Sequence, residues 1–146
     1  VLMNLACFYA IYHLAPAGEN LTFADLKGLH RRSPLLAFTL GAGAFGMAGI
    51  PPTVGFTGKF MVFTAAIQKG FYALVILGVI NAAISAFYYL KMVRAAYSQA
   101  DELQRSRVTL GISAQLLGVV LILAIVLIGI FPQSFVDLAK QAVAVL

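Results

Sequence analysis

The stretch 47-MAGIPPTVGFTGKF-60 decides the fold of this chain, because it places two adjacent prolines and a lysine inside a long apolar segment. Proline lacks a backbone N–H donor and clashes with the preceding turn, so a helix that enters this stretch must break. Glycines on each side allow an irregular backbone. The stretch predicts a helix broken at residues 49–55, with Lys59 shortly after the break. The residues that mark the break are Gly49, Pro51, Pro52 and Gly55.

The composition of the chain excludes an ordinary soluble domain. Of its 146 residues, 62% are hydrophobic and 10% are charged, and the mean hydropathy is +0.95. A typical soluble domain carries about 25% charged residues. Several apolar runs are long enough to cross a bilayer. We therefore predict an all-α integral membrane protein with about four transmembrane helices, the first truncated and the second discontinuous, followed by a C-terminal interfacial helix.

Polar interruptions divide the chain into these predicted helices. Ser33-Pro34 is a strong helix start, with serine as N-cap and proline at the first helical position. Thr22 and Asp25 have capping-box spacing, which predicts a short helical turn before Gly28. The chain opens inside an apolar run without a signal peptide, so we expect further sequence to precede it. The predicted helices cover residues 1–14, 34–70 with its break, 71–97 and 108–131, with an amphipathic tail at 133–146.

The distribution of lysine and arginine predicts the topology, because these residues are enriched in cytoplasmic loops. If residues 34–70 cross the membrane once, seven of them share one side and two share the other, whereas two crossings give five against four. The single crossing places the loops 15–33 and 98–107 in the cytoplasm and the C-terminus on the opposite side. The net charge of +5 therefore indicates topology and not binding to nucleic acid. The two groups are Lys27, Arg31, Arg32, Lys91, Arg94, Arg105 and Arg107 against Lys69 and Lys140.

Two stretches resemble nucleotide-binding motifs but lack residues that those motifs require. Gly41, Gly43 and Gly46 spell G-x-G-x-x-G, but no strand precedes them and no acidic residue follows at the required distance. A P-loop is excluded because Thr53 and Phe60 replace its first glycine and its magnesium-binding hydroxyl. The glycines are better explained as small residues that allow close helix packing in a membrane.

The single cysteine, Cys7, excludes an internal disulfide and any cysteine-based metal or cluster site. It lies in an apolar run, where a free cysteine behaves as a small hydrophobic packing residue. We predict no metal site and no cofactor-binding residue in this chain.

Lys59 is the principal candidate site. It lies ten residues before Lys69, or about 15 Å along a helix, in a hydrocarbon core about 30 Å thick. A lysine near the midplane marks a functional site by default. It is expected in the first turn of the second half-helix, where desolvation and the helix dipole oppose its charge and free carbonyls of the first half-helix favour it. This balance predicts a proton-transfer group. The alternative is a structural lysine that only caps those carbonyls.

Other polar residues are weaker candidates for a proton path. Asn81 and Ser85 either line water near Lys59 or bond neighbouring helices, as such side chains commonly do in membranes. Thr57 is also expected to cap the second half-helix, and the more common role of histidines at helix ends and in loops is structural. The proton-path candidates are His13, Thr57, Asn81, Ser85 and Tyr88, with Tyr89 adjacent.

Three stretches resemble one membrane-protein family over nearly the whole chain. They are 25-DLKGLHRRSPLLAF-38, 47-MAGIPPTVGFTGKFMVF-63 and 87-FYYLKMVRAAY-97. Together they are similar to the C-terminal part of subunit N, an antiporter-like subunit of bacterial respiratory complex I, the proton-pumping NADH:quinone oxidoreductase. The resemblance implies that Lys59 is the terminal lysine of a proton half-channel in redox-driven proton translocation. It also implies that the other charged residues of the proton path lie outside this chain.

The resemblance further implies a location and partners. The chain is expected in the bacterial inner membrane with a periplasmic C-terminus, surrounded by lipid and by other membrane subunits of complex I. NADH, FMN, iron–sulfur clusters and a quinone would be bound by those other subunits. Two alternatives stay open, namely a subunit of a Mrp-type cation/proton antiporter without redox chemistry and a purely structural membrane segment.

Overall fold

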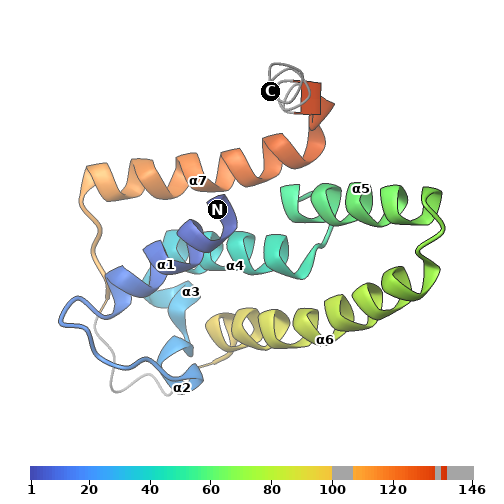
Figure 1. The fold of residues 1–146 in the computed structure, drawn as a ribbon. Helices are drawn as coiled ribbons and strands as arrows, with labels where there is room; N and C mark the ends of the chain where they lie inside the picture. Colours follow the sequence, from blue (N-terminus) through green and yellow to red (C-terminus); the bar gives the residue numbers. More distant parts are fainter. Residues whose placement is uncertain (100–106, 134–135, 138–146) are drawn as a thin grey trace.

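The computed structural model describes residues 1–99, 107–133 and 136–137, and seven helices lie in this part of the chain. The central helix is α4, which packs against α1, α3, α6 and α7. Its side chains Leu36, Ala37, Leu40 and Ala44 are fully buried. In chain order the helices are α1 (Leu2–Leu14), α2 (Phe23–Leu26), α3 (Leu29–Arg32), α4 (Pro34–Ala48), α5 (Val54–Gln68), α6 (Tyr72–Tyr97) and α7 (Ile112–Ile130) (Figure 1).

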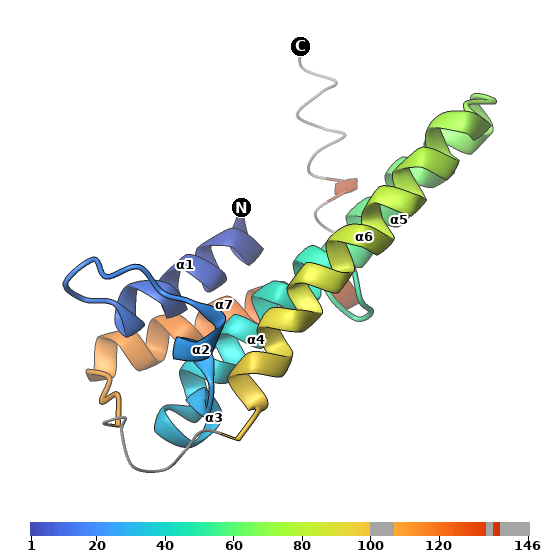
Figure 2. The same cartoon turned by 90° about the horizontal axis from the view of Figure 1, so that it is seen from below.

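The predicted discontinuous helix is confirmed. Helix α4 ends at Ala48, α5 begins at Val54, and the intervening residues 49–53 are not helical. Figures 1 and 2 show α5 continuing in the general direction of α4, with α6 returning along both. The prolines therefore interrupt one path through the structure and do not reverse it.

Small residues of α4 allow α1 to approach its backbone closely. A Cβ atom added at Gly43 would lie 2.8 Å from Cys7 Sγ and 2.8 Å from the Met3 carbonyl oxygen, and one at Gly46 would lie 2.6 Å from Met3 Sδ. Cys7 itself is buried in this contact. The structure thus supports both interpretations made from sequence, that the glycines serve helix packing and that the cysteine is a packing residue.

The two polar loops meet at one end of the helices. Gly28 N donates to Ser98 O at 3.0 Å, and Val108 N donates to Arg32 O at 3.3 Å. The predicted turn before Gly28 is present as α2, where the N–H of Thr22 donates to the Asp25 carboxylate at 2.8 Å. Shared backbone bonds therefore place residues 15–33 and the chain on both sides of residues 100–106 at the same end of the structure.

Several predicted boundaries need correction. The last long helix starts at Ile112 and not at 108, because residues 107–111 are not helical and Val108 donates its N–H to another segment. Gly55 is not in the break but is the second residue of α5. Helix α5 ends at Gln68, and Gly70 makes the turn to α6 with a left-handed φ of 79°. The predicted amphipathic tail lies largely outside the described residues, of which positions 133, 136 and 137 are helical.

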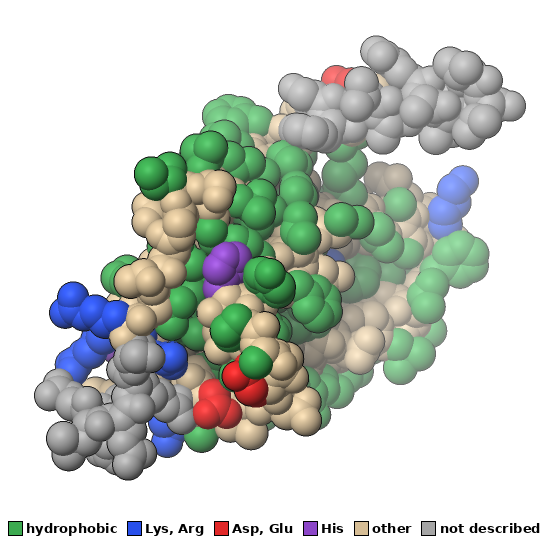
Figure 3. All heavy atoms as spheres, turned by 90° about the vertical axis from the view of Figure 1, so that its left-hand side faces the viewer, with side chains coloured by type: hydrophobic (Ala, Val, Ile, Leu, Met, Phe, Trp, Pro, Cys, Tyr) green, Lys and Arg blue, Asp and Glu red, His purple; other side chains and the backbone are tan. Residues whose placement is uncertain are grey.

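Apolar side chains cover the outside of the helices, as expected in a membrane. Helices α6 and α7 are each long and apolar enough to cross a bilayer, and the most apolar window of α6 is not buried within the structure. Figure 3 shows Lys and Arg side chains gathered at one edge of the end that carries the polar loops. Among the described residues, Lys69 lies at the far end of α5, and Lys59 lies between that end and the polar loops. The other Lys and Arg lie in these loops or just before one of them, namely Lys27, Arg31, Arg32, Lys91, Arg94 and Arg107.

Candidate functional site

The site begins with the way α4 ends. The last four carbonyl groups of a helix have no partner in the helical ladder and require other donors, above all where water is excluded. Gly49 takes a left-handed φ of 84°, and the turn lets backbone N–H groups fold back onto two of these carbonyls. Gly49 N and Ile50 N both donate to Phe45 O at 3.0 Å, and Gly49 N also donates to Gly46 O at 3.0 Å. This is a Schellman-type cap.

Lys59 supplies donors to the other two carbonyls. Its Nζ donates to Met47 O at 2.8 Å and to Ala48 O at 3.0 Å. An ammonium group at a helix C-terminus also interacts favourably with the negative end of the helix dipole. Gly49 suits this position, since its φ of 84° is one that L side chains rarely adopt and an added Cβ would lie 2.9 Å from Lys59 Cδ. The break in the helix is therefore closed by the same side chain that the sequence identified as the candidate site.

The position of Lys59 differs from the sequence prediction in one respect. Helix α5 begins at Val54, so Lys59 is in its second turn and not in its first. From there the side chain reaches back across the break to α4. The capping contact that the structural alternative predicted is therefore present.

A cavity of about 270 Å³ borders Lys59 on the side of α6. Asn81 and Ser85 of α6 line it, so two of the polar candidates lie beside the lysine. Ser85 Oγ donates to Asn81 O at 2.8 Å, within the helix. Tyr89 lines the cavity, whereas Tyr88 does not; it is 61% exposed and contacts Phe87. The complete lining is Met47, Lys59, Phe63, Gly78, Asn81, Ala82, Ser85 and Tyr89.

The remaining candidates lie elsewhere. His13 is at the end of α1, where its Nδ1 lies 3.0 Å from Tyr9 O and its ring packs against Tyr9, and it does not line the cavity at Lys59. Thr57 does not cap α5, because the N-cap position belongs to Thr53. Thr53 Oγ1 donates to Ile50 O at 2.7 Å, while Thr57 Oγ1 donates to Gly129 O of α7 at 3.0 Å.

Gly129 of α7 is a further residue of the site that the sequence does not single out. A Cβ atom there would collide with Pro52 O, so α7 meets the backbone of the break directly. The available signal was a glycine near the end of an apolar span, three residues before Pro132. That signal does not identify the partner, which lies far back in the sequence.

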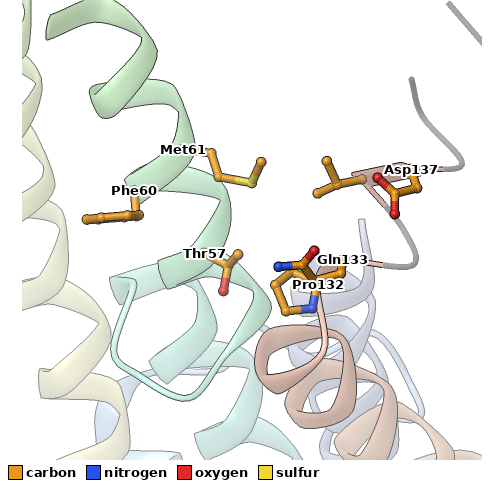
Figure 4. A pocket seen from close by; sticks show the side chains of 7 residues that line it. Thr57, Phe60, Met61, Pro132, Gln133 and Asp137 are labelled. Atoms are coloured by element: carbon orange, nitrogen blue, oxygen red, sulfur yellow. The ribbon is translucent and has the colours of Figure 1, made fainter. Parts of the chain in front are cut away.

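A second cavity of about 350 Å³ lies between α5 and the chain that follows α7. Figure 4 shows Thr57, Phe60 and Met61 on the α5 side, with Pro132, Gln133 and Asp137 opposite them. Residues 57 and 59 lie about 200° apart around a helix, so this cavity and Lys59 are on different sides of α5. Among the residues that the structure describes, no group of His, Cys, Asp and Glu has an arrangement suited to a metal ion.

Comparison with known proteins agrees with this architecture. Residues 1–85 match the family described as "NADH:quinone oxidoreductase/Mrp antiporter, TM". The chain is 44% identical over 144 residues to NADH-quinone oxidoreductase subunit N 2 of Opitutus terrae, covering 99% of this chain and 30% of that protein. It is 42% identical over 142 residues to subunit N 2 of Syntrophobacter fumaroxidans, covering 97% and 30%. It is 40% identical over 144 residues to subunit N of Methylovorus glucosotrophus, covering 98% and 30%.

The chain thus spans about 30% of the length of the curated relatives that it matches. The family match covers the broken helix, Lys59 and the part of α6 that lines the neighbouring cavity up to Ser85. On this match, the chain belongs to the NADH:quinone oxidoreductase/Mrp antiporter transmembrane family.

Proposed function

We propose that this chain is part of subunit N of a proton-pumping NADH:quinone oxidoreductase and that Lys59 exchanges a proton there as the terminal group of a half-channel. The observation that carries the proposal is the placement of the Lys59 amine between two helix-end carbonyls and a cavity with polar lining. Ionisable residues within membrane-spanning segments commonly mark ion paths. The names of the relatives, all subunit N of an NADH-quinone oxidoreductase, support the assignment.

Two features of the geometry support a proton-exchange role for Lys59. A charged lysine has three N–H donors, and the carbonyls of Met47 and Ala48 receive two of them. Charge-assisted bonds of this kind are roughly twice as strong as neutral ones, so they offset part of the cost of a charge in the membrane. The cavity lined by Asn81 and Ser85 gives the amine a neighbouring polar space through which a proton can arrive or leave.

We also propose the setting of the whole protein. It lies in the bacterial inner membrane, with residues 15–33 and 98–107 in the cytoplasm and the C-terminus in the periplasm, and its partners are the other membrane subunits of the complex. The excess of Lys and Arg around the loops supports this orientation. On the family resemblance, FMN, iron–sulfur clusters and the NADH and quinone sites belong to other subunits, and this chain binds none of them.

The test is Lys59→Met in the complete protein within its membrane complex, with Lys69→Met as the matched control. Lys69 lies at the end of α5 and is exposed. NADH-driven proton uptake into membrane vesicles is measured together with NADH oxidation. We expect Lys59→Met to lower proton translocation by about tenfold or more, since a positioned proton-transfer group contributes roughly 10²–10⁴-fold. If Lys59→Met translocates protons as well as Lys69→Met does, the proposal is refuted and a purely structural role of Lys59 is favoured.

A second candidate is a cation/proton antiporter of the Mrp type, which the shared family description supports. The broken helix and the lysine suit both functions. Purification of the native assembly separates them: flavin and iron–sulfur absorbance in the complex that contains this protein supports the oxidoreductase, and their absence together with sodium/proton exchange supports the antiporter.

A further inference from the structure

One turn of α5 caps the C-terminal ends of two different helices. Lys59 donates to the last two carbonyls of α4, and Thr57 Oγ1 donates to Gly129 O, one residue before the end of α7. Pro132 follows α7 and has no N–H with which to continue its ladder. Figure 4 shows the Thr57 side chain facing the chain that leaves α7 at Pro132 and Gln133.

The same end of α7 touches the backbone of the break. A Cβ atom at Gly129 would lie 2.6 Å from Val54 N and would collide with Pro52 O and the Thr53 carbonyl carbon. Gly129 therefore contacts both the last residues of the break and the first residue of α5. A hydrogen bond and a backbone contact together fix the start of α5 against α7.

This attachment matters because the break removes the helical bonds that would otherwise hold α5 in register with α4. Within residues 49–53, the bonds that remain are local, such as Thr53 N and Oγ1 to Ile50 O at 3.1 and 2.7 Å. The α4–α5 register then depends on contacts such as Gly55 against the Gly46 carbonyl and on the Lys59 bonds. The Lys59 bonds weaken when the amine loses its proton. The Thr57–Gly129 bond joins two uncharged groups and does not titrate.

We propose that Thr57 and Gly129 are positioning residues, through which the end of α7 keeps the Lys59 amine within reach of α4 in both of its protonation states. The inference rests on the proposed function, since it assumes that Lys59 exchanges protons. Residues 57 and 59 lie on different sides of α5. Helix α7 therefore contacts α5 on one side, and the Lys59 amine bonds to α4 from the other.

The test compares Thr57→Val, Thr57→Ser and the control Thr64→Val in the complete protein within its complex. Thr64 lies on the same helix, but its hydroxyl donates to Phe60 O of α5 itself at 2.8 Å. The measurements are the amount of assembled complex and the pH profile of NADH-driven proton translocation per NADH oxidised. The loss of one hydrogen bond changes an equilibrium constant about three- to tenfold, so we expect Thr57→Val to lower proton translocation by this factor. We also expect it to shift the pH at which translocation is half-maximal. Thr57→Ser keeps the hydroxyl donor and is expected to restore the translocation and its pH profile, and Thr64→Val is expected to resemble the parent in both.

A double variant decides whether Thr57 acts through Lys59. If it does, Thr57→Val lowers translocation in the parent and adds no further loss to Lys59→Met, whereas independent effects multiply. Gly129→Ala provides a second perturbation of the same contact, and we expect it to shift the pH profile in the same direction as Thr57→Val. A Thr57→Val protein that pumps like Thr64→Val overturns the inference and leaves the proposed function intact. A Lys59→Met protein that pumps normally overturns the proposed function itself.

Discussion

The amine of Lys59 lies 2.8 Å from the carbonyl oxygen of Met47, a residue that precedes it by twelve positions and belongs to the other half of the broken helix. A single side chain thus joins two helical segments that share no helical hydrogen bonds across residues 49–53. The geometry of the break and the environment of the lysine amine therefore depend on each other.

Gly49→Ala is expected to disturb the lysine without removing it. The φ of 84° is one that L side chains rarely adopt, and the new Cβ would lie 2.9 Å from Lys59 Cδ and 3.1 Å from Nζ. We expect a loss of stability of about 1–2 kcal/mol and lower proton translocation, measured by thermal denaturation of the complete protein and by vesicle pumping. The control is Gly58→Ala, because nothing lies within 4 Å of a Cβ at that helical position. If the two variants are equally stable and active, the described cap is incorrect.

Ser85→Leu tests the cavity beside Lys59. The larger side chain would occupy part of its volume of about 270 Å³ and displace any water that carries protons to the amine. We expect proton translocation to fall several-fold while the amount of assembled complex is maintained. Ala83→Leu, on the exposed side of the same helix, is the control and is expected to pump like the parent. Unchanged pumping by Ser85→Leu would show that protons reach Lys59 by another route.

Gly46→Ala tests the close packing of α1 on α4. The new Cβ would lie 2.6 Å from Met3 Sδ and 2.8 Å from Met3 Cγ, so the methionine has to move. Forcing extra atoms into a packed contact costs about 1–3 kcal/mol, and we expect the lower end of this range because the displaced atoms belong to a flexible side chain. We expect Gly46→Ala to lower the melting temperature and Met3→Ala to restore much of the loss when the two are combined. A double variant that is no more stable than Gly46→Ala alone would contradict this packing.

Tyr9→Phe tests the bond that ties α1 to α7. The Tyr9 hydroxyl donates to Ala114 O at 2.6 Å, and its ring is buried. Its removal is expected to lower the free energy of unfolding by about 1 kcal/mol, measured by denaturant or thermal unfolding of the detergent-solubilised protein. Tyr12→Phe is the matched control on the same helix, since Tyr12 is 70% exposed. If Tyr9→Phe and Tyr12→Phe lower the free energy of unfolding equally, the Tyr9–Ala114 hydrogen bond does not stabilise the protein.

The features that could be predicted from the sequence are those with local causes. Adjacent prolines break a helix wherever they occur, so the interruption before Lys59 was evident, as was the helix start at Ser33-Pro34. The boundaries were less accurate, because Val108 gives its N–H to Arg32 and so delays the start of α7. Local sequence contains no information about such a partner.

The features that could not be predicted depend on pairs far apart in the chain. Thr57 has a suitable position for a cap of its own helix, but its hydroxyl donates to Gly129, 72 residues away. Tyr88 and Tyr89 are equivalent in sequence, and only the rotation of α6 against α5 determines that Tyr89 lines the cavity. Lys59 could be identified because it is a charged residue in the middle of an apolar segment. The residues around it could not be identified, because they depend on how α5 packs against other helices.

The cap formed by Lys59 has a mechanical consequence. A hinge is ordinarily as stiff as its covalent and hydrogen-bonded parts allow, and that stiffness is constant. Here two of the bonds across the break come from one lysine amine. On the proposed function this amine gains and loses a proton, and its bonds to the carbonyls of α4 are stronger in the charged state. The stiffness of the junction between the two half-helices would then follow the protonation of one side chain, while the Thr57–Gly129 bond keeps a part of it that does not vary.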